Sequence, residues 1–271
     1  MGKDKDYFLG THDDEIARLA LQHRVWRPRA SDAWKRAGFN VGQTLLDVGC
    51  GPGFATVDMA EIVGPSGKIV SLDRSRRFLD YLESIRLQRG LENIVTNELD
   101  LDEGTLPSVM ADGAWARWVF AFVKHPRELL ERVSTRLKKG GVIVLHEYFD
   151  YSTWRLAPRC LELEEFVSVV TKSWRESGGE PEIGLNLPSW LEETGFEIQS
   201  VTPIIDIVPS SNYIWQWLKL FIDVEVPRFV HLGYFTPERA EAIASAFAKG
   251  EASPHTRLIT PAVIEIIAVK R

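Results

Sequence analysis

The sequence predicts an α/β fold, with a doubly wound and mostly parallel seven-stranded sheet that carries helical cap insertions. Two observations predict it. Short apolar segments alternate with helix-length amphipathic segments through the first 150 residues, and a glycine-rich turn follows the first apolar segment. Strands that alternate with helices in this way form a parallel sheet with helices on both faces, joined by right-handed crossovers.

The expected elements follow in order along the chain. Strands are expected at residues 45–48, 68–72, 93–99, 113–120, 142–145, 196–207 and 263–269. Helices are expected at residues 12–37, 54–62, 75–88, 126–137, 161–174, 188–194, 212–230 and 237–249. Pro28 should divide the first helical segment into two helices, because a proline lacks the backbone N–H. Gly38 should close that segment.

Composition narrows the class of protein. The chain has 271 residues, of which 45% are hydrophobic and 26% charged, as in ordinary soluble domains. A net charge of −6 disfavours nucleic acid as a partner. No run of 18 apolar residues predicts a membrane span, and the charged N-terminus lacks the apolar stretch of a signal peptide, so we expect a cytoplasmic protein. Two cysteines, Cys50 and Cys160, predict neither a disulfide framework nor a zinc site.

The strongest local signal is the segment Leu-Leu-Asp-Val-Gly-Cys-Gly-Pro-Gly-Phe-Ala-Thr at residues 45–56. Its glycines allow a tight turn and close approach of a ligand, and the helix that follows presents free N–H groups suited to a carboxylate or phosphate. A P-loop is excluded because no Gly-Lys-Ser/Thr follows. A dinucleotide site needs a third glycine where Phe54 stands. Spacing alone leaves the ligand class open.

Four segments, taken in order, resemble the class I S-adenosylmethionine-dependent methyltransferases, which have a Rossmann-like fold. Residues 47–53 resemble the first motif of that family, and residues 137–141 resemble its Leu-Lys-Pro-Gly-Gly segment, with Lys139 in place of proline. Asp73, at the end of the second strand, matches the acidic residue that binds the ribose, and a carboxylate can accept bonds from both hydroxyls. Asp100 matches the residue near the adenine amino group, with Asp102 as its competitor. The resemblance covers residues 40–150.

The resemblance implies S-adenosylmethionine as cofactor and S-adenosylhomocysteine as product. The cofactor-binding residues that we expect are Asp47, Gly49, Cys50, Gly51, Gly53, Asp73, Arg74, Asp100, Leu101, Arg117 and Tyr7. Cys50 should be a small filler of the turn. Arg117 should hold the cofactor or an anionic substrate group, or else form an ion pair with a carboxylate. Tyr7 should approach the methyl group, or else belong to a helix staple or a disordered tail.

The acceptor side is predicted from the edge of the sheet and from the C-terminal half. His146 follows the fifth strand and is the candidate general base, with a packed wall residue as the alternative. The segment from His146 to Asp150 is not HExxH, so no metal is expected. Aromatic residues are frequent after residue 150, which favours a small, partly apolar acceptor, although aromatic residues at helical spacing also build cores.

Three regions follow from this interpretation. Residues 1–40 form an N-terminal helical segment over the cofactor site, residues 41–150 the cofactor-binding core, and residues 151–271 the rest of the sheet with an aromatic-rich substrate cap at about 151–195 and 208–258. Expected partners are a small-molecule substrate, with no nucleic acid and no membrane; the oligomeric state stays open. Two alternatives remain: an NAD(P)-dependent oxidoreductase, and a non-catalytic protein that binds S-adenosylmethionine.

Overall fold

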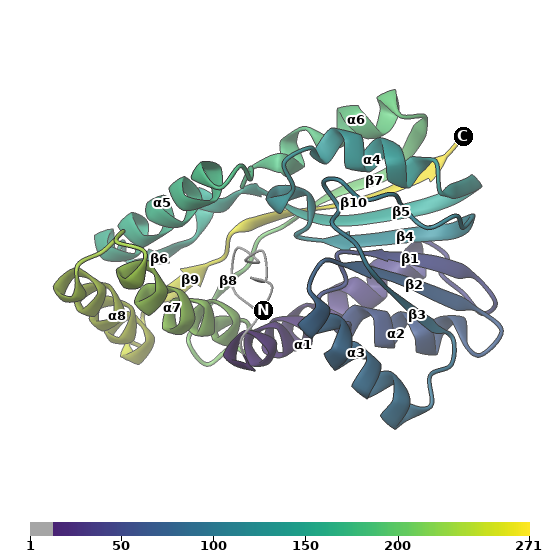
Figure 1. Ribbon diagram of the computed structural model, residues 1–271. Coiled ribbons are helices and arrows are strands. Elements are labelled where there is room, and N and C mark those ends of the chain that lie inside the picture. The colour runs from purple at the N-terminus through teal and green to yellow at the C-terminus, as the bar shows by residue number, and fades with distance from the viewer. Residues whose placement is uncertain (1–12) are drawn as a thin grey trace.

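The computed structural model describes residues 13–271 and is built on one seven-stranded sheet (Figure 1). Its strands, in spatial order, are β3 (Ile94–Glu98), β2 (Lys68–Asp73), β1 (Thr44–Val48), β4 (Ala111–Arg117), β5 (Leu137–Asp150), β10 (Ala262–Lys270) and β7 (Phe196–Ile204). The strands from β1 to β5 pair in parallel, and β10 is antiparallel to both of its neighbours. The doubly wound, mostly parallel seven-stranded sheet is confirmed.

Helices cover both faces of this sheet (Figure 1). The helices α1 (Asp13–Arg36), α2 (Phe54–Val63) and α3 (Arg76–Arg89) lie on one side, and α4 (Pro126–Ser134) and α6 (Leu187–Glu193) lie on the other. Each side buries its own apolar cluster against the strands. This arrangement leaves the carboxyl ends of the parallel strands as the edge where a ligand can approach.

The prediction that Pro28 divides the first helix is wrong, because α1 continues through it. Pro28 is exposed, so the carbonyl that loses its helical hydrogen bond can reach water. Beyond the proline, Ala30, Ala33 and Trp34 are fully buried in the cluster beneath α1, so tertiary packing holds the second half of the helix. Gly38 closes the segment with a φ of 74°, as predicted.

Two strands differ from their predicted bounds. The fourth strand ends at Arg117 instead of residue 120, because Trp118 adopts a φ of 53° and the chain turns into a short helix, η1 (Phe120–Phe122). The apolar segment 196–207 splits between β7 and the short strand β8 (Ile207–Val208), which pairs in a different sheet. The strand β5 starts at Leu137, earlier than predicted.

The C-terminal half adds a cap with its own small sheet, at one end of the large one (Figure 1). The cap strands β6 (Arg155–Ala157), β9 (Arg257–Ile259) and β8 form this three-stranded sheet. The cap helices are α5 (Leu161–Glu176), α7 (Ile214–His231) and α8 (Pro237–Ala252), with the short η2 (Tyr151–Thr153) and η3 (Ile183–Leu185). The predicted helical insertion between the sixth and seventh strands is therefore confirmed. No helix among residues 13–271 is long and apolar enough to cross a membrane.

Candidate functional site

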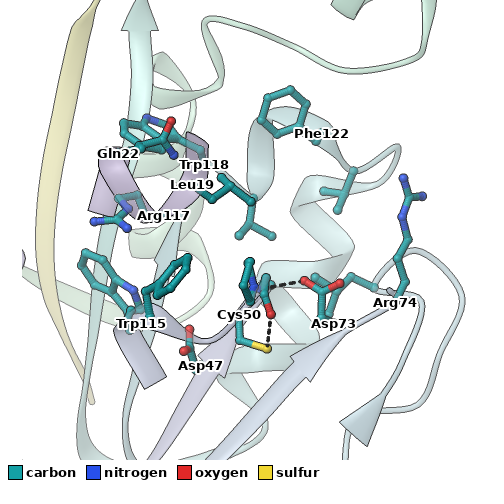
Figure 2. Close-up of a pocket in the computed structure, with 18 of the residues that line it drawn as sticks. Leu19, Gln22, Asp47, Cys50, Asp73, Arg74, Trp115, Arg117, Trp118 and Phe122 are labelled. Atoms are coloured by element: carbon teal, nitrogen blue, oxygen red, sulfur yellow. Dashed lines mark hydrogen bonds between the residues drawn. The ribbon is translucent and has the colours of Figure 1, made fainter. Parts of the chain in front are cut away.

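A cavity lies at the carboxyl ends of β1, β2, β4 and β5, between α1 and the cap (Figure 2). Many residues predicted from the sequence line it. They are Asp47, Gly49, Cys50, Gly51, Asp73, Arg74, Asp100, Leu101 and Arg117. Gly53 and His146 are not among its lining residues. Tyr7 lies outside the described residues.

The glycine turn has backbone conformations that only glycine adopts readily. Gly49, Gly51 and Gly53 have φ angles of 67°, 53° and 82°. A Cβ atom on Gly49 would lie 2.5 Å from Cγ2 of Val119, and one on Gly53 would lie 2.3 Å from Cδ1 of Leu82. A Cβ on Gly51 would meet nothing within 4 Å. Gly49 and Gly53 therefore allow close packing, and Gly51 leaves open space beside the cavity.

Asp73 ties this turn to the end of β2. Its Oδ2 accepts a hydrogen bond from the backbone N–H of Gly51 at 2.8 Å, drawn in Figure 2, and its Oδ1 accepts one from Ser75 at 2.8 Å. Burial raises the pKa of Asp73, and the two N–H groups oppose that shift. Each carboxylate oxygen still has a lone pair for a ligand. Asp73 can thus hold the turn and accept hydrogen bonds from the cavity.

Two further acidic residues reach the same end of the cavity from the segment after β3. Asp100 accepts a hydrogen bond from the N–H of Asp102 at 2.9 Å. Asp102 accepts hydrogen bonds from the N–H groups of Lys124 at 2.7 Å and of His125 at 3.4 Å. Asp102 is therefore occupied in holding the segment before α4, which leaves Asp100 the better placed of the two to meet a ligand.

Asp47 and Cys50 form the floor of the turn. Thr56 donates a hydrogen bond of 2.5 Å to Asp47, and burial raises the pKa of this carboxyl group to about 7. Burial also raises the pKa of the Cys50 thiol well above its usual value, so the thiol stays protonated. A protonated, buried thiol suits the predicted role of a small filler.

Arg117 is held by a chain of side chains from α1 and α2. Its Nη2 lies 3.2 Å from Nδ1 of His23, and Nε2 of His23 lies 3.0 Å from a carboxylate oxygen of Asp58. Burial lowers the pKa of His23, and a guanidinium only donates, so a neutral His23 accepts from Arg117 and donates to Asp58. Burial also lowers the pKa of Arg117 to about 10.

One nitrogen of this guanidinium has no hydrogen-bond partner in the described part of the chain. Nη1 of Arg117 is buried without a hydrogen bond, and Arg117 forms no ion pair among residues 13–271. The guanidinium lies over the rings of Trp115 and Trp118, at 5.8 and 5.3 Å from their centroids. The simple ion pair considered from the sequence is therefore not observed, and an unpaired donor lines the cavity beside the glycine turn.

His146 is a packed wall residue in this structure and does not line the cavity, which is the alternative that we considered to a general base. The side chain is fully buried, and its Nε2 lies 2.9 Å from Glu265, whose other oxygen accepts from Arg36 at 2.5 Å. The rings of Trp26 and Trp115 pack on it edge to face. It lies on β5 two residues before the cavity-lining Tyr148, where α1 covers the strand. Burial lowers its pKa, so His146 is neutral.

The far end of the cavity is an aromatic chamber. Its rings come from the turn after β4 and from η1, β5, α5 and α7, and they belong to Trp118, Phe122, Tyr148, Trp174 and Phe221. Trp118 and Tyr148 stack with centroids 5.2 Å apart.

Sequence reasoning missed the contribution of α1 to this chamber. Arg18, Leu19 and Gln22 line the cavity from that helix, and Figure 2 labels Leu19 and Gln22. The available signal was a series of polar residues at helical spacing, Glu15, Arg18 and Gln22, which are all buried on one face of α1.

Comparisons with known proteins place this chain in a family. A family model of the methyltransferase domain matches residues 39–181. A demethylmenaquinone methyltransferase from Anoxybacillus flavithermus is 38% identical over 71% of this chain and 78% of its own length. An uncharacterised protein encoded in a transposon of Streptomyces fradiae is 29% identical over 71% of this chain, and the match spans 54% of that protein.

A solved structure shows the same fold. It is that of a methyltransferase-like protein from Bacillus halodurans, which superposes with a TM-score of 0.60 at 14% identity and covers 89% of this chain and 98% of its own. The sequence matches favour the methyltransferase over the nicotinamide-dependent oxidoreductase. With its glycine turn, its seven-stranded sheet and these matches, the chain belongs to the class I S-adenosylmethionine-dependent methyltransferases.

Proposed function

We propose that this chain transfers the methyl group of S-adenosylmethionine to a small, partly apolar molecule. The observation that carries the proposal is the continuity of one cavity, which joins the glycine turn and Asp73 at one end to an aromatic chamber at the other. Such a cavity can hold a polar nucleoside and an apolar acceptor side by side. Cavities lined by aromatic groups and a few placed polar groups are typical of small-molecule sites.

The proposed cofactor contacts follow from the geometry of the polar end. The turn at Gly49 and Gly51, next to the N-terminus of α2, would receive the amino-acid end of the cofactor. Asp73 would accept hydrogen bonds from the ribose, and Asp100 from the adenine amino group, with Leu101 against the base. Arg74 lines the cavity beside Asp73.

Arg117 is the proposed partner of the cofactor's carboxylate. Its buried and unpartnered Nη1 is a donor that needs an acceptor, since an unsatisfied buried donor costs free energy. The cation also lies on β4, the neighbour of the strand that leads into the glycine turn. A carboxylate at this position would satisfy the nitrogen and pair with its charge.

The bound cofactor supplies an electrophilic methyl group on a sulfonium. The protein's contribution is to hold the acceptor atom in line with that methyl group, which can replace a large part of the entropic barrier. The rings of Trp118, Tyr148 and Phe221 keep the chamber poor in water, which suits a step in which positive charge on sulfur disappears. No histidine lines the cavity among residues 13–271. We therefore expect the residues that line the chamber to act mainly by orienting the acceptor molecule.

Two measurements test the proposal. Calorimetry should detect binding of S-adenosylhomocysteine to the folded chain, and incubation with S-adenosylmethionine and small aromatic acceptors should form S-adenosylhomocysteine. Demethylmenaquinone belongs in the acceptor panel because a relative is named for it. Binding without turnover on any acceptor would favour a non-catalytic cofactor-binding protein. Absence of binding would reject the cofactor site itself.

A further inference from the structure

Gln22 presents a fixed hydrogen-bond donor to the aromatic chamber. This residue lines the cavity from α1 and is only 8% exposed. Its Oε1 accepts two hydrogen bonds, from Nη1 of Arg18 at 2.9 Å and from Nε1 of Trp217 at 3.2 Å. Its Nε2 has no hydrogen-bond partner within residues 13–271. The amide oxygen therefore bonds to protein groups, and the amide NH₂ group can donate to a ligand in the cavity.

The orientation of this amide is forced by its neighbours. An arginine guanidinium and a tryptophan indole can only donate hydrogen bonds. If the amide were flipped, its NH₂ group would face two donors, and both would lose their acceptor. Arg18 is itself held by a two-fold interaction with Glu15, with distances of 2.7 and 2.6 Å. The donor at Gln22 is therefore as fixed as the helix that carries it.

The chamber next to this donor is lined by aromatic rings. Trp118 stacks between Tyr148, at 5.2 Å, and Trp217, at 5.6 Å, with interplanar angles of 13° and 16°. Trp217 links Gln22 to this stack, because it donates a hydrogen bond to Gln22 and its ring stacks on Trp118; Figure 2 labels both Gln22 and Trp118 among the lining residues. The Tyr148 hydroxyl is neutral because burial raises its pKa, so it too can donate. The chamber thus combines ring surfaces with hydrogen-bond donors.

We propose that Gln22 is a specificity-determining residue, and that the chamber selects an apolar molecule that carries a hydrogen-bond-accepting oxygen of the carbonyl class. This inference rests on the proposed function, because it names the acceptor that the chamber would hold beside the cofactor. A molecule that carries only a hydrogen-bond donor at this position would bring that donor against the NH₂ group of Gln22. Neither the donor of the molecule nor the NH₂ group would then have an acceptor. Such mismatches are the strongest source of discrimination in buried polar sites.

Three matched bicyclic compounds test the proposal on the full chain saturated with S-adenosylhomocysteine. They are 1-indanone, which carries a carbonyl, indane, which carries no polar group, and 4-aminoindane, which carries a donor. Binding is followed by the change in tryptophan fluorescence of the chain, to which the lining residues Trp118 and Trp174 contribute. The wild-type chain should bind 1-indanone about 3- to 10-fold more tightly than indane, the gain of one net hydrogen bond, and 4-aminoindane no better than indane.

Two variants locate the effect at Gln22. In Gln22→Glu at pH 8.5, one oxygen keeps the bonds from Arg18 and Trp217, and the other replaces the NH₂ group with an acceptor. The preference should therefore invert in favour of 4-aminoindane. Gln22→Met removes the donor without adding charge, so the preference for 1-indanone should be lost and 1-indanone and indane should bind about equally. Affinity for S-adenosylhomocysteine, measured by calorimetry, reports that each variant is folded.

The outcomes separate this inference from the proposed function. Equal binding of 1-indanone and indane to the wild-type chain overturns the role of Gln22, as does a preference for 1-indanone that survives in both variants. Failure of every bicyclic probe to bind, with normal S-adenosylhomocysteine binding, overturns the selection by the chamber and leaves the cofactor site intact. Failure of S-adenosylhomocysteine to bind the wild-type chain rejects the proposed function, and this inference with it.

Discussion

Replacement of Arg117 by methionine should weaken the binding of S-adenosylhomocysteine by about 10- to 150-fold. Methionine keeps a long apolar side chain over Trp115 and Trp118, but it removes the cation and the unpartnered Nη1. A hydrogen bond to a charged group contributes about 1.5–3 kcal/mol, and each 1.4 kcal/mol changes an affinity tenfold. The expected loss of binding free energy is therefore the contribution of one charge-assisted hydrogen bond between this guanidinium and the carboxylate of the ligand.

The assay is calorimetric titration with two ligands, S-adenosylhomocysteine and its analogue without the carboxyl group. The analogue should bind the wild-type chain and Arg117→Met with similar affinity, so the difference between the two ligands isolates the contact. Arg24→Met is the matched control, because Arg24 is an exposed arginine on α1 that bonds to Tyr213 and does not line the cavity. If Arg117→Met weakens both ligands equally, or neither, the carboxylate assignment is wrong.

Three further changes probe other parts of the site. Asp73→Ala should weaken S-adenosylhomocysteine at least tenfold in calorimetry, because it removes the proposed ribose acceptor and the partner of the Gly51 N–H; unchanged affinity would reject the ribose assignment. His146→Phe should lower the free energy of unfolding by about 1–3 kcal/mol, because Glu265 loses a buried partner. The variant should leave the pH profile of turnover unchanged; if one ionisation disappears from that profile, His146 is the general base after all. Burial raises the pKa of Glu147 to about 7, so the native state binds more protons than the unfolded state between pH 4.5 and 7. The free energy of unfolding should therefore fall as pH rises through that window, by up to about 3 kcal/mol, relative to Glu147→Gln in denaturant titrations; a parallel pH dependence in both proteins would contradict this.

The sequence was sufficient for the large sheet because its signals are local. Most parallel strands contain a short apolar segment, and the crossover helices have apolar faces, so order and direction follow from the pattern. The errors occur where distant contacts decide. α1 passes through Pro28 because buried residues beyond it pack on the sheet. The segment 196–207 is divided between two sheets, because Ile207 pairs with the cap strand β9 and not with β10.

The same distinction applies to the site. The glycine turn and Asp73 could be predicted because a motif fixes their relative positions along the chain. Arg117 was singled out from its place at a strand end, but its support by His23 and Asp58 joins three elements and has no sequence signature. Gln22 was missed for the same reason: its partner Trp217 is 195 positions away. The residues proposed to recognise the acceptor are thus positioned by contacts between segments that lie far apart in the sequence, and a local pattern does not predict such contacts.

Trp118 shows how the fold maintains a strained backbone conformation at the point where the glycine-turn end of the cavity meets the aromatic chamber. A non-glycine residue at a φ of 53° is uncommon and costs roughly 1–3 kcal/mol, so surrounding contacts must determine it. Its N–H donates to the carbonyl of His146, and the next two N–H groups donate to one oxygen of the buried Glu147. Tyr148 and Trp217 hold its ring from both sides. Because a regular continuation of β4 would send the next side chain to the opposite face of the sheet, the strained turn is what allows Arg117 and Trp118 to line the same cavity.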